Sequence, residues 1–347
     1  MRWSYNLERS YGVAAWLFAV AALIVAMVVV GGATRLTGSG LSITEWKPIL
    51  GVVPPLSEQG WQVAFHKYQQ IPQYHYVTRG ISLGEFKTLY WWEWGHRLLA
   101  RLLGLVFFVP LVVFLWLKRI PRRLVWRCWA ILALGALQGL VGWWMVASGL
   151  EQRVSVAPER LATHLGLALL VYCACLWTAL EAWFGRGRSP LGQDERWASN
   201  AGALAAAVYL QSLLGALVAG SKAGLVYNDW PLMGGRLFPH DYVQKGQGML
   251  DALLHSQAAV QFNHRIGAYV VFALVMTFAA LIWRAPRIPQ GSRTAAAVLA
   301  GAVVVQVLLG VTTLMAGDPL WLALLHQLGA VAVLSAAVVT AWRLRRS

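Results

Sequence analysis

Four histidines lie near the expected outer starts of hydrophobic segments, and their residue type and spacing suggest cofactor chemistry. They are His96, His164, His264 and His326. Neutral imidazole is a common axial ligand of haem iron. Ionisable side chains are costly inside a bilayer and usually mark a functional site there. Because two of these histidines lie in each half of the chain, the pattern predicts one haem-sized site in each half.

The pattern gives less support to a structural role or a non-haem metal for these histidines. A single histidine in a membrane helix can simply be a hydrogen-bond donor between helices, but four at matching repeat positions favour a shared role. A non-haem metal site is less favoured because no set of nearby carboxylates accompanies the histidines in each half. The remaining histidines have no repeat partner, and we expect them to be solvated or interfacial: His66, His75, His240 and His255.

The elements that carry the four histidines are predicted to be membrane helices. Of the 347 residues, 58% are hydrophobic and only 12% are charged, so an ordinary soluble domain is excluded. The hydrophobic residues form blocks of about 20, enough to cross a bilayer core. The sequence predicts an all-α polytopic membrane protein with eight transmembrane helices. Their expected ranges are 12–33, 96–117, 124–147, 162–184, 197–219, 262–284, 294–316 and 320–342.

The net charge of +15 is interpreted as a topology signal rather than as a nucleic-acid-binding surface. Short loops rich in lysine and arginine stay in the cytoplasm. The basic residues gather on one side of the predicted membrane, so we expect a multi-pass protein of the cell inner membrane with both termini in the cytoplasm. They are Arg2, Arg9, Lys118, Arg119, Arg122, Arg123, Arg186, Arg188, Arg196, Arg284, Arg287, Arg293, Arg343, Arg345 and Arg346.

The two halves of the sequence resemble each other. The run from Gly40 to Trp46 is similar to the run from Gly224 to Trp230, and His96-Arg97 corresponds to His264-Arg265. Gln138 to Gly142 likewise corresponds to Gln306 to Gly310. Four helices separate matching elements, so the halves are parallel repeats. We expect two pseudo-symmetric four-helix bundles, residues 1–185 and 186–347.

Two outer segments, 34–93 and 220–261, are unusually long for connections without structure of their own. Between Trp61 and Tyr90 we expect short interfacial helices, with the neighbouring tryptophans as an aromatic belt or along a porphyrin access path.

Gly135 and Gly139 have the small-xxx-small spacing of close helix contacts, although glycine is common in membrane helices. The three cysteines, Cys128, Cys173 and Cys175, all fall inside spans.

The two histidine pairs differ in one ionisable residue. Glu93 lies one helical turn before His96, whereas the matching position before His264 is Gln261. This difference suggests chemistry in the first half and electron handling in the second. Alternatively, Glu93 is an interfacial acid paired with Arg97 or Lys87. Arg97 and Arg265 are candidate partners of haem propionates, or they extend to lipid phosphate.

Several motifs together resemble the haem A synthase family, in its mitochondrial and alphaproteobacterial branch. The resemblance covers nearly the whole chain. It rests on the first outer loop from Gly40 to Pro48, on Ile71 to Tyr74, on Glu85 to Lys87, on Glu93 to Arg97, on Gly224 to Pro231 and on the two later histidine motifs. Members of that family oxidise the C8 methyl of haem O to the formyl group of haem A, through hydroxylation, for terminal oxidases.

The resemblance implies roles for the individual residues. His96 and His164 match the histidines of the catalytic half, which bind the iron of the substrate haem O, and Glu93 matches its acidic residue. His264 and His326 match the axial ligands of a resident haem b. Haem O synthase and a membrane electron acceptor are the implied partners, and the sequence leaves open whether the chain forms homo-oligomers. The alternatives are a membrane di-haem b-type electron carrier and a haem transporter.

Overall fold

The computed structural model describes residues 9–185 and 195–346. Within these ranges, eight helices are long and apolar enough to span a membrane, which confirms the predicted fold class. Four lie in each half of the chain. They are α1 (Tyr11–Leu36), α4 (Leu83–Trp116), α5 (Arg122–Ala147), α6 (Pro158–Phe184), α7 (Glu195–Ser221), α9 (Gln257–Arg284), α10 (Gln290–Met315) and α11 (Leu320–Arg346).

The second long helix begins much earlier than expected. The hydropathy pattern predicts a start near residue 96, but α4 begins at Leu83. The hydroxyl of Ser82 accepts a hydrogen bond from the main-chain N–H of Glu85, and the Glu85 carboxylate accepts one from the N–H of Ser82. This reciprocal cap starts a helix in polar surroundings, so hydropathy alone misses it. As a result His96 lies about four turns into α4, not in its first few residues.

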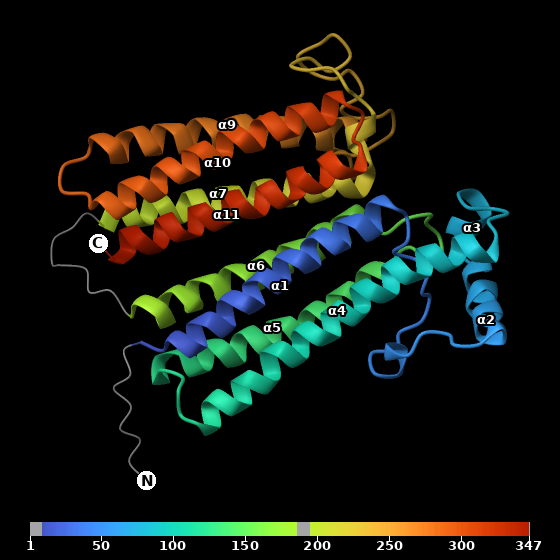
Figure 1. Cartoon of the computed structure of the whole chain (residues 1–347). Helices are drawn as coiled ribbons and strands as arrows, with labels where there is room; N and C mark the ends of the chain where they lie inside the picture. The colour runs from blue at the N-terminus through green and yellow to red at the C-terminus, as the bar shows by residue number, and fades with distance from the viewer. Residues whose placement is uncertain (1–8, 186–194, 347) are drawn as a thin grey trace.

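The long helices form a central group with a pair on each side (Figure 1). Helices α1, α6, α7 and α11 pack on one another across the two halves. Helices α4 and α5 flank this group beside the first half, and α9 and α10 flank it beside the second. The contacts correspond, since α1 packs on α4 and α6 as α7 packs on α9 and α11. These contacts agree with the predicted repeat, and the two-fold relation between the halves stays a prediction.

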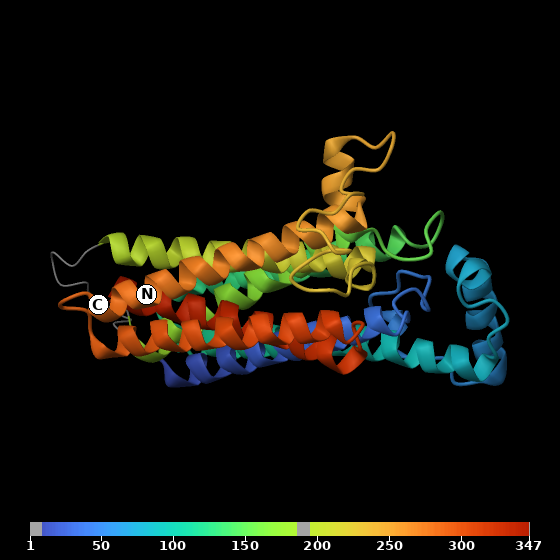
Figure 2. The same ribbon diagram turned by 90° about the horizontal axis from the view of Figure 1, so that it is seen from above.

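One end of the molecule carries most of the additional structure (Figures 1 and 2). The short helices α2 (Glu58–Gln69) and α3 (Pro72–Tyr76) lie there beside the first turns of α4, as predicted for short interfacial helices. A cluster of buried side chains joins them to α4, including Trp61, Tyr68 and Phe86. The preceding loop contains the one-turn helix η1 (Leu50–Val52). The first outer loop is therefore folded.

The second outer segment is shorter and also has a defined structure. It holds the one-turn helix η2 (Ala223–Leu225) and α8 (Met249–His255). Between them, an isolated bridge pairs Met233 with Arg236. The short connection at Gly317, Asp318 and Pro319 is a tight turn, and both Gly317 and Asp318 have positive φ angles.

The predicted close contact at Gly135 and Gly139 is wrong. A Cβ added at either glycine of α5 would meet nothing within 4 Å, because no described residue packs on this face of the helix. The close contact in α5 is at Gly142 instead, against His164. Of the cysteines, Cys128 and Cys175 are buried among apolar side chains, and Cys173 is half-buried.

The start of α1 and the end of α11 lie at the end of the bundle opposite α2 and α3 (Figure 1). The basic connections between α4 and α5 and between α9 and α10 are at this same end. Arg2, Arg186 and Arg188, which also contribute to the predicted topology, lie outside the described residues.

Candidate functional site

The four predicted ligand histidines lie on four different long helices. His96 is on α4, His164 on α6, His264 on α9 and His326 on α11. The last three are in the second turn of their helices. All four imidazoles are half-buried. The remaining histidines lie in the outer loops, as predicted: His66, His75 and His240 are exposed, and His255 is hydrogen-bonded to Asp251 and Glu159.

Each of the four imidazoles packs against a glycine on the preceding long helix. A Cβ added to any of these glycines would lie about as close to the ring as atoms can approach, between 2.8 and 3.1 Å away. At Gly142 and Gly310 a larger residue would force the ring to shift, and at Gly31 and Gly215 the ring would have to give by a few tenths of an ångström. The glycines are Gly31, Gly142, Gly215 and Gly310, facing His96, His164, His264 and His326 in that order.

The two histidines of the second half face each other directly. The ring centroids of His264 and His326 are 6.4 Å apart, and the ring planes are perpendicular. In the first half, His164 lies close enough to His96 for an electrostatic interaction, but no ring contact joins them in the described part of the chain. The structure therefore brings together the two pairs that the sequence predicted, more tightly in the second half.

Three of the four histidines have a glutamine partner that sequence reasoning missed. The side-chain Nε2 of Gln138 lies 3.1 Å from Nδ1 of His164, and that of Gln211 lies 2.9 Å from Nδ1 of His264. Gln306 contacts Nδ1 of His326 in the same way, at 3.1 Å. The sequence does contain a signal for these contacts, since each glutamine stands four residues before the glycine that touches its histidine. Two of the three motifs also belong to the repeat.

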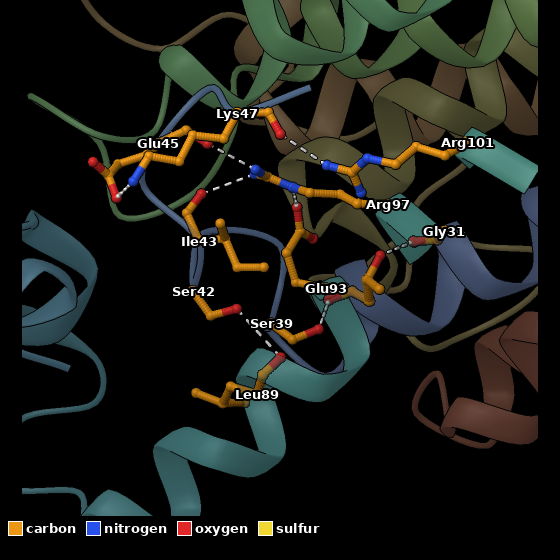
Figure 3. A network of polar contacts seen from close by, with 11 residues as sticks. Gly31, Ser39, Ser42, Ile43, Glu45, Lys47, Leu89, Glu93, Arg97 and Arg101 are labelled. Carbon is orange, nitrogen blue, oxygen red and sulfur yellow. Dashed lines mark hydrogen bonds and ion pairs between the residues drawn. The ribbon is translucent and has the colours of Figure 1, made fainter. Parts of the chain in front are cut away.

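In the first half, Glu93 and Arg97 join the histidine helix to the outer loop (Figure 3). Nε of Arg97 donates to Oε1 of Glu93 at 2.7 Å, which is the pairing of the alternative interpretation of Glu93. The same guanidinium donates to the main-chain oxygens of Ile43 and Glu45, at 2.8 and 2.9 Å. Glu93 itself is buried. The motif from Gly40 to Trp46 is thus fixed above His96 by an arginine one residue further along α4.

The second half repeats this arrangement with a neutral partner. Nη2 of Arg265 donates to Oε1 of Gln261 at 3.3 Å and to the main-chain oxygen of Tyr227 at 3.0 Å. Its Nη1 donates to the oxygens of Asp229 and Leu232. Both arginines therefore hold loop carbonyls here. Their pairing with haem propionates stays a prediction.

Hydrogen bonds to acidic side chains stabilise both outer loops. Lys67 and Lys47 hold the carboxylate of Glu45 and lower its pKa, Lys67 contributing most. The main-chain N–H groups of Gly234 and Gly235 donate to Asp229 and lower the pKa of that carboxyl. These contacts link segments within each outer loop.

The class of protein follows from this fold and site: a polytopic membrane protein whose helices present paired histidines under folded outer loops. The chain matches the COX15-CtaA family, described as cytochrome oxidase assembly protein, over residues 14–338, and it belongs to that family. Its relatives include proteins named heme A synthase. One from Caulobacter vibrioides is 56% identical over 339 residues, covering 98% of each chain. One from Maricaulis maris is 45% identical over 343 residues, covering 99% of each.

Proposed function

We propose that this protein is a haem A synthase, an oxidoreductase that converts the C8 methyl of haem O to a formyl group. Membership of the family and near-full-length similarity to relatives of that name support this. The proposal rests chiefly on a difference between the two halves of the chain at the position one turn before the first histidine of each half. A buried carboxylate stands beside His96, and a neutral amide stands beside His264.

The second half fits a resident haem b. A bond from a metal to an imidazole nitrogen is about 2 Å long, so two histidines that would hold one iron must bring their ring centroids to within about 6 Å of each other. The 6.4 Å between the rings of His264 and His326 agrees with this spacing. We propose that these two residues are the axial ligands. When bound, haem b supplies one-electron redox chemistry, which the axial ligands tune.

The first half is proposed to bind the substrate, haem O, between His96 and His164. Conversion of a methyl to a formyl group with oxygen from water releases four protons and four electrons. Those protons require an acceptor near the reacting carbon. Glu93 suits this role because Arg97 binds only its Oε1, and Oε2 lies beside Gly40 without a hydrogen bond from any described residue. The four electrons would need a membrane acceptor, and the haem b that His264 and His326 would hold would supply one-electron chemistry suited to their transfer.

The proposed domains follow from these roles. Residues 1–185 form the half that binds haem O, and residues 186–347 form the half that binds haem b. We further propose an inner-membrane location with both termini in the cytoplasm, since the basic connections lie at one end of the bundle. The histidines and the folded loops then lie on the outer side. Haem O synthase is the proposed supplier of the substrate.

The test is expression of the full chain in cells that make haem O but no haem A, followed by pigment extraction. Haem A should appear with the wild-type protein and should be absent from cells with the empty vector. Failure of wild-type protein to yield any haem A, while it is present in the membrane at normal abundance, refutes the proposal. A reduced spectrum with a b-type signal but no haem A would instead indicate an electron carrier.

A further inference from the structure

The four histidine sites are not equivalent in their hydrogen bonds. Each glutamine that contacts Nδ1 of a histidine also donates to the main-chain oxygen of that histidine. These distances are 3.0 Å for Gln138, 2.9 Å for Gln211 and 2.9 Å for Gln306. His96 makes no side-chain hydrogen bond to any described residue. The position that corresponds to the glutamines, four residues before Gly31, is Met27.

The orientation of the ring differs at the same site. The ring atom nearest to the packed glycine is Cε1 in His164, His264 and His326, but it is Nε2 in His96. Neutral histidine usually binds metal through one nitrogen, with the other fixed by a hydrogen bond. His96 has no such bond to a described residue, and its Nε2 faces the backbone of α1. Its ring must turn before Nε2 can reach iron.

Each of the three glutamines has an atom suited to fixing the ring of its histidine. When Nε2 of histidine binds iron, Nδ1 carries the proton and needs an acceptor. The side-chain Oε1 atoms of Gln138, Gln211 and Gln306 are buried and have no partner in the described part of the chain. Half a turn of the amide places Oε1 at Nδ1, in exchange for the bond to the histidine carbonyl. Such a bond fixes the ring and raises the basicity of the ligand.

Two of these glutamine amides also pack tightly against a glycine. A Cβ at Gly267 would overlap Oε1 of Gln211, and a Cβ at Gly329 would overlap Oε1 of Gln306. Each of these glycines lies three residues after its histidine, on the same helix face. Both sites of the second half therefore hold the glutamine against the histidine by shape as well as by hydrogen bonding.

We propose that these three glutamines are positioning residues for axial histidines, and that His96 is the axial ligand that releases. This inference rests on the proposed function, since it concerns the same haem sites. The second half has two fixed ligands, as a resident haem requires. The first half has one fixed ligand, His164, and one that is held only by packing.

The first experiment measures the midpoint potential of haem b in the purified full chain. Gln306→Leu removes the acceptor, and Gln306→Glu strengthens it. The midpoint potential should be highest with leucine at position 306, intermediate with glutamine and lowest with glutamate. Each step should change the equilibrium constant of haem reduction about tenfold, which is about 59 mV. The matched controls are Gln327→Leu and Gln327→Glu. Gln327 follows His326 directly, but its amide binds the carbonyl of Val28 instead of the ring.

The controls should move the potential by much less, and the largest g-value of the ferric spectrum should shift only in the Gln306 series. Equal shifts in the two series would show a mere effect of local charge and overturn the role of Gln306. This result can be separated from the proposed function. If the wild-type protein forms no haem A but the potentials follow the expected order, the proposed enzyme activity is refuted and the assignment of the glutamines still holds.

The second experiment tests His96 by adding the missing contact. The chain is loaded with iron protoporphyrin IX, and transfer to apomyoglobin is followed. We expect haem transfer to show a fast and a slow phase. The phase whose rate changes in His96→Ala is the fast one, which belongs to the His96 site. Met27→Gln should slow the fast phase at least tenfold, in line with the usual effect of such partners. Met27→Leu should not. Equal fast rates in the two variants, with the slow phase at its wild-type rate, would overturn the assignment of His96.

Discussion

Replacing Glu93 with glutamine separates the two roles that the carboxylate has in this structure. As an acceptor from Arg97 it holds the outer loop, and as a free oxygen beside Gly40 it is the proposed proton acceptor. Glutamine keeps an oxygen for Arg97 but cannot take a proton. The second half shows that the amide suffices for the first role, because Gln261 accepts from Arg265 there.

The expected cost in stability is small. Hydrogen bonds to charged groups contribute about 1.5–3 kcal/mol. Arg97 stays charged in the variant, so its bond to the amide oxygen remains in this class, and only the charge of the acceptor is lost. The variant should therefore lose about 1–2 kcal/mol, a shift of only a few degrees in Tm. Arg97 retains its bonds to the loop carbonyls of Ile43 and Glu45, so the loop stays in place. Loss of a general base costs about 10²–10⁴ in rate, far more than this change in stability.

The assay compares haem A formed per mole of protein in Glu93→Gln, in wild type and in the control Glu45→Gln. Glu45 is a loop acid whose carboxylate pairs with Lys47 and Lys67. Glu93→Gln should keep its haem b and lose at least 100-fold in turnover, whereas the control should stay near wild type. Turnover of Glu93→Gln within a factor of ten of wild type would refute the role of Glu93 as proton acceptor.

The histidine pairs, a packed glycine and the second outer loop each allow a further test. Alanine at His264 or at His326 should deplete haem b in the purified protein, whereas His96→Ala should spare it and abolish haem A formation; full retention of haem b in both second-half variants contradicts the assignment of halves. Gly32→Ala should destabilise the fold by about 1–3 kcal/mol, because its Cβ overpacks against Gln327. The measurement is Tm, which should fall. The control Gly104→Ala should leave Tm unchanged, since its Cβ meets no described atom within 4 Å. The lowered pKa of Asp229 stabilises the second loop above the pKa of an unfolded aspartate, near 3.9, and this stability is lost as the pH falls through the folded pKa; Tm measured against pH should lose that acid dependence in Asp229→Asn.

The positions of the candidate site residues were largely predictable from the sequence. Histidines inside or at the edge of apolar segments are conspicuous, Glu93 lies one turn before one of them, and the repeat sorted the histidines into pairs. The spans were also predictable, since their hydropathy is high. The start of α4 was not, because a cap made by Ser82 and Glu85 depends on local hydrogen bonds in a polar segment. Hydropathy marks where lipid begins, and helices extend beyond it.

The contacts that support the site were not predictable in the same way. The charge of Arg97 and Arg265 suggested propionates or lipid as their partners, but they hold main-chain oxygens of the loops. Main-chain acceptors leave no trace in a residue pattern. The glutamines at 138 and 306 were visible as a repeat, yet spacing alone does not show which side chain on the next helix they meet.

The departures from the repeat fall on one histidine. His264 stands between Gln211 on the preceding helix and Gln261 one turn earlier on its own. His96 has Met27 and Glu93 at the matching places. The first change removes the hydrogen bond that we propose to fix an axial ligand, and the second introduces the proposed proton acceptor. An enzyme that oxidises a haem as substrate needs both at one site: a ligand that releases the haem and a base near the reacting carbon. Their coincidence at His96 is what a duplicated haem-binding bundle requires to change from holding its cofactor to modifying it.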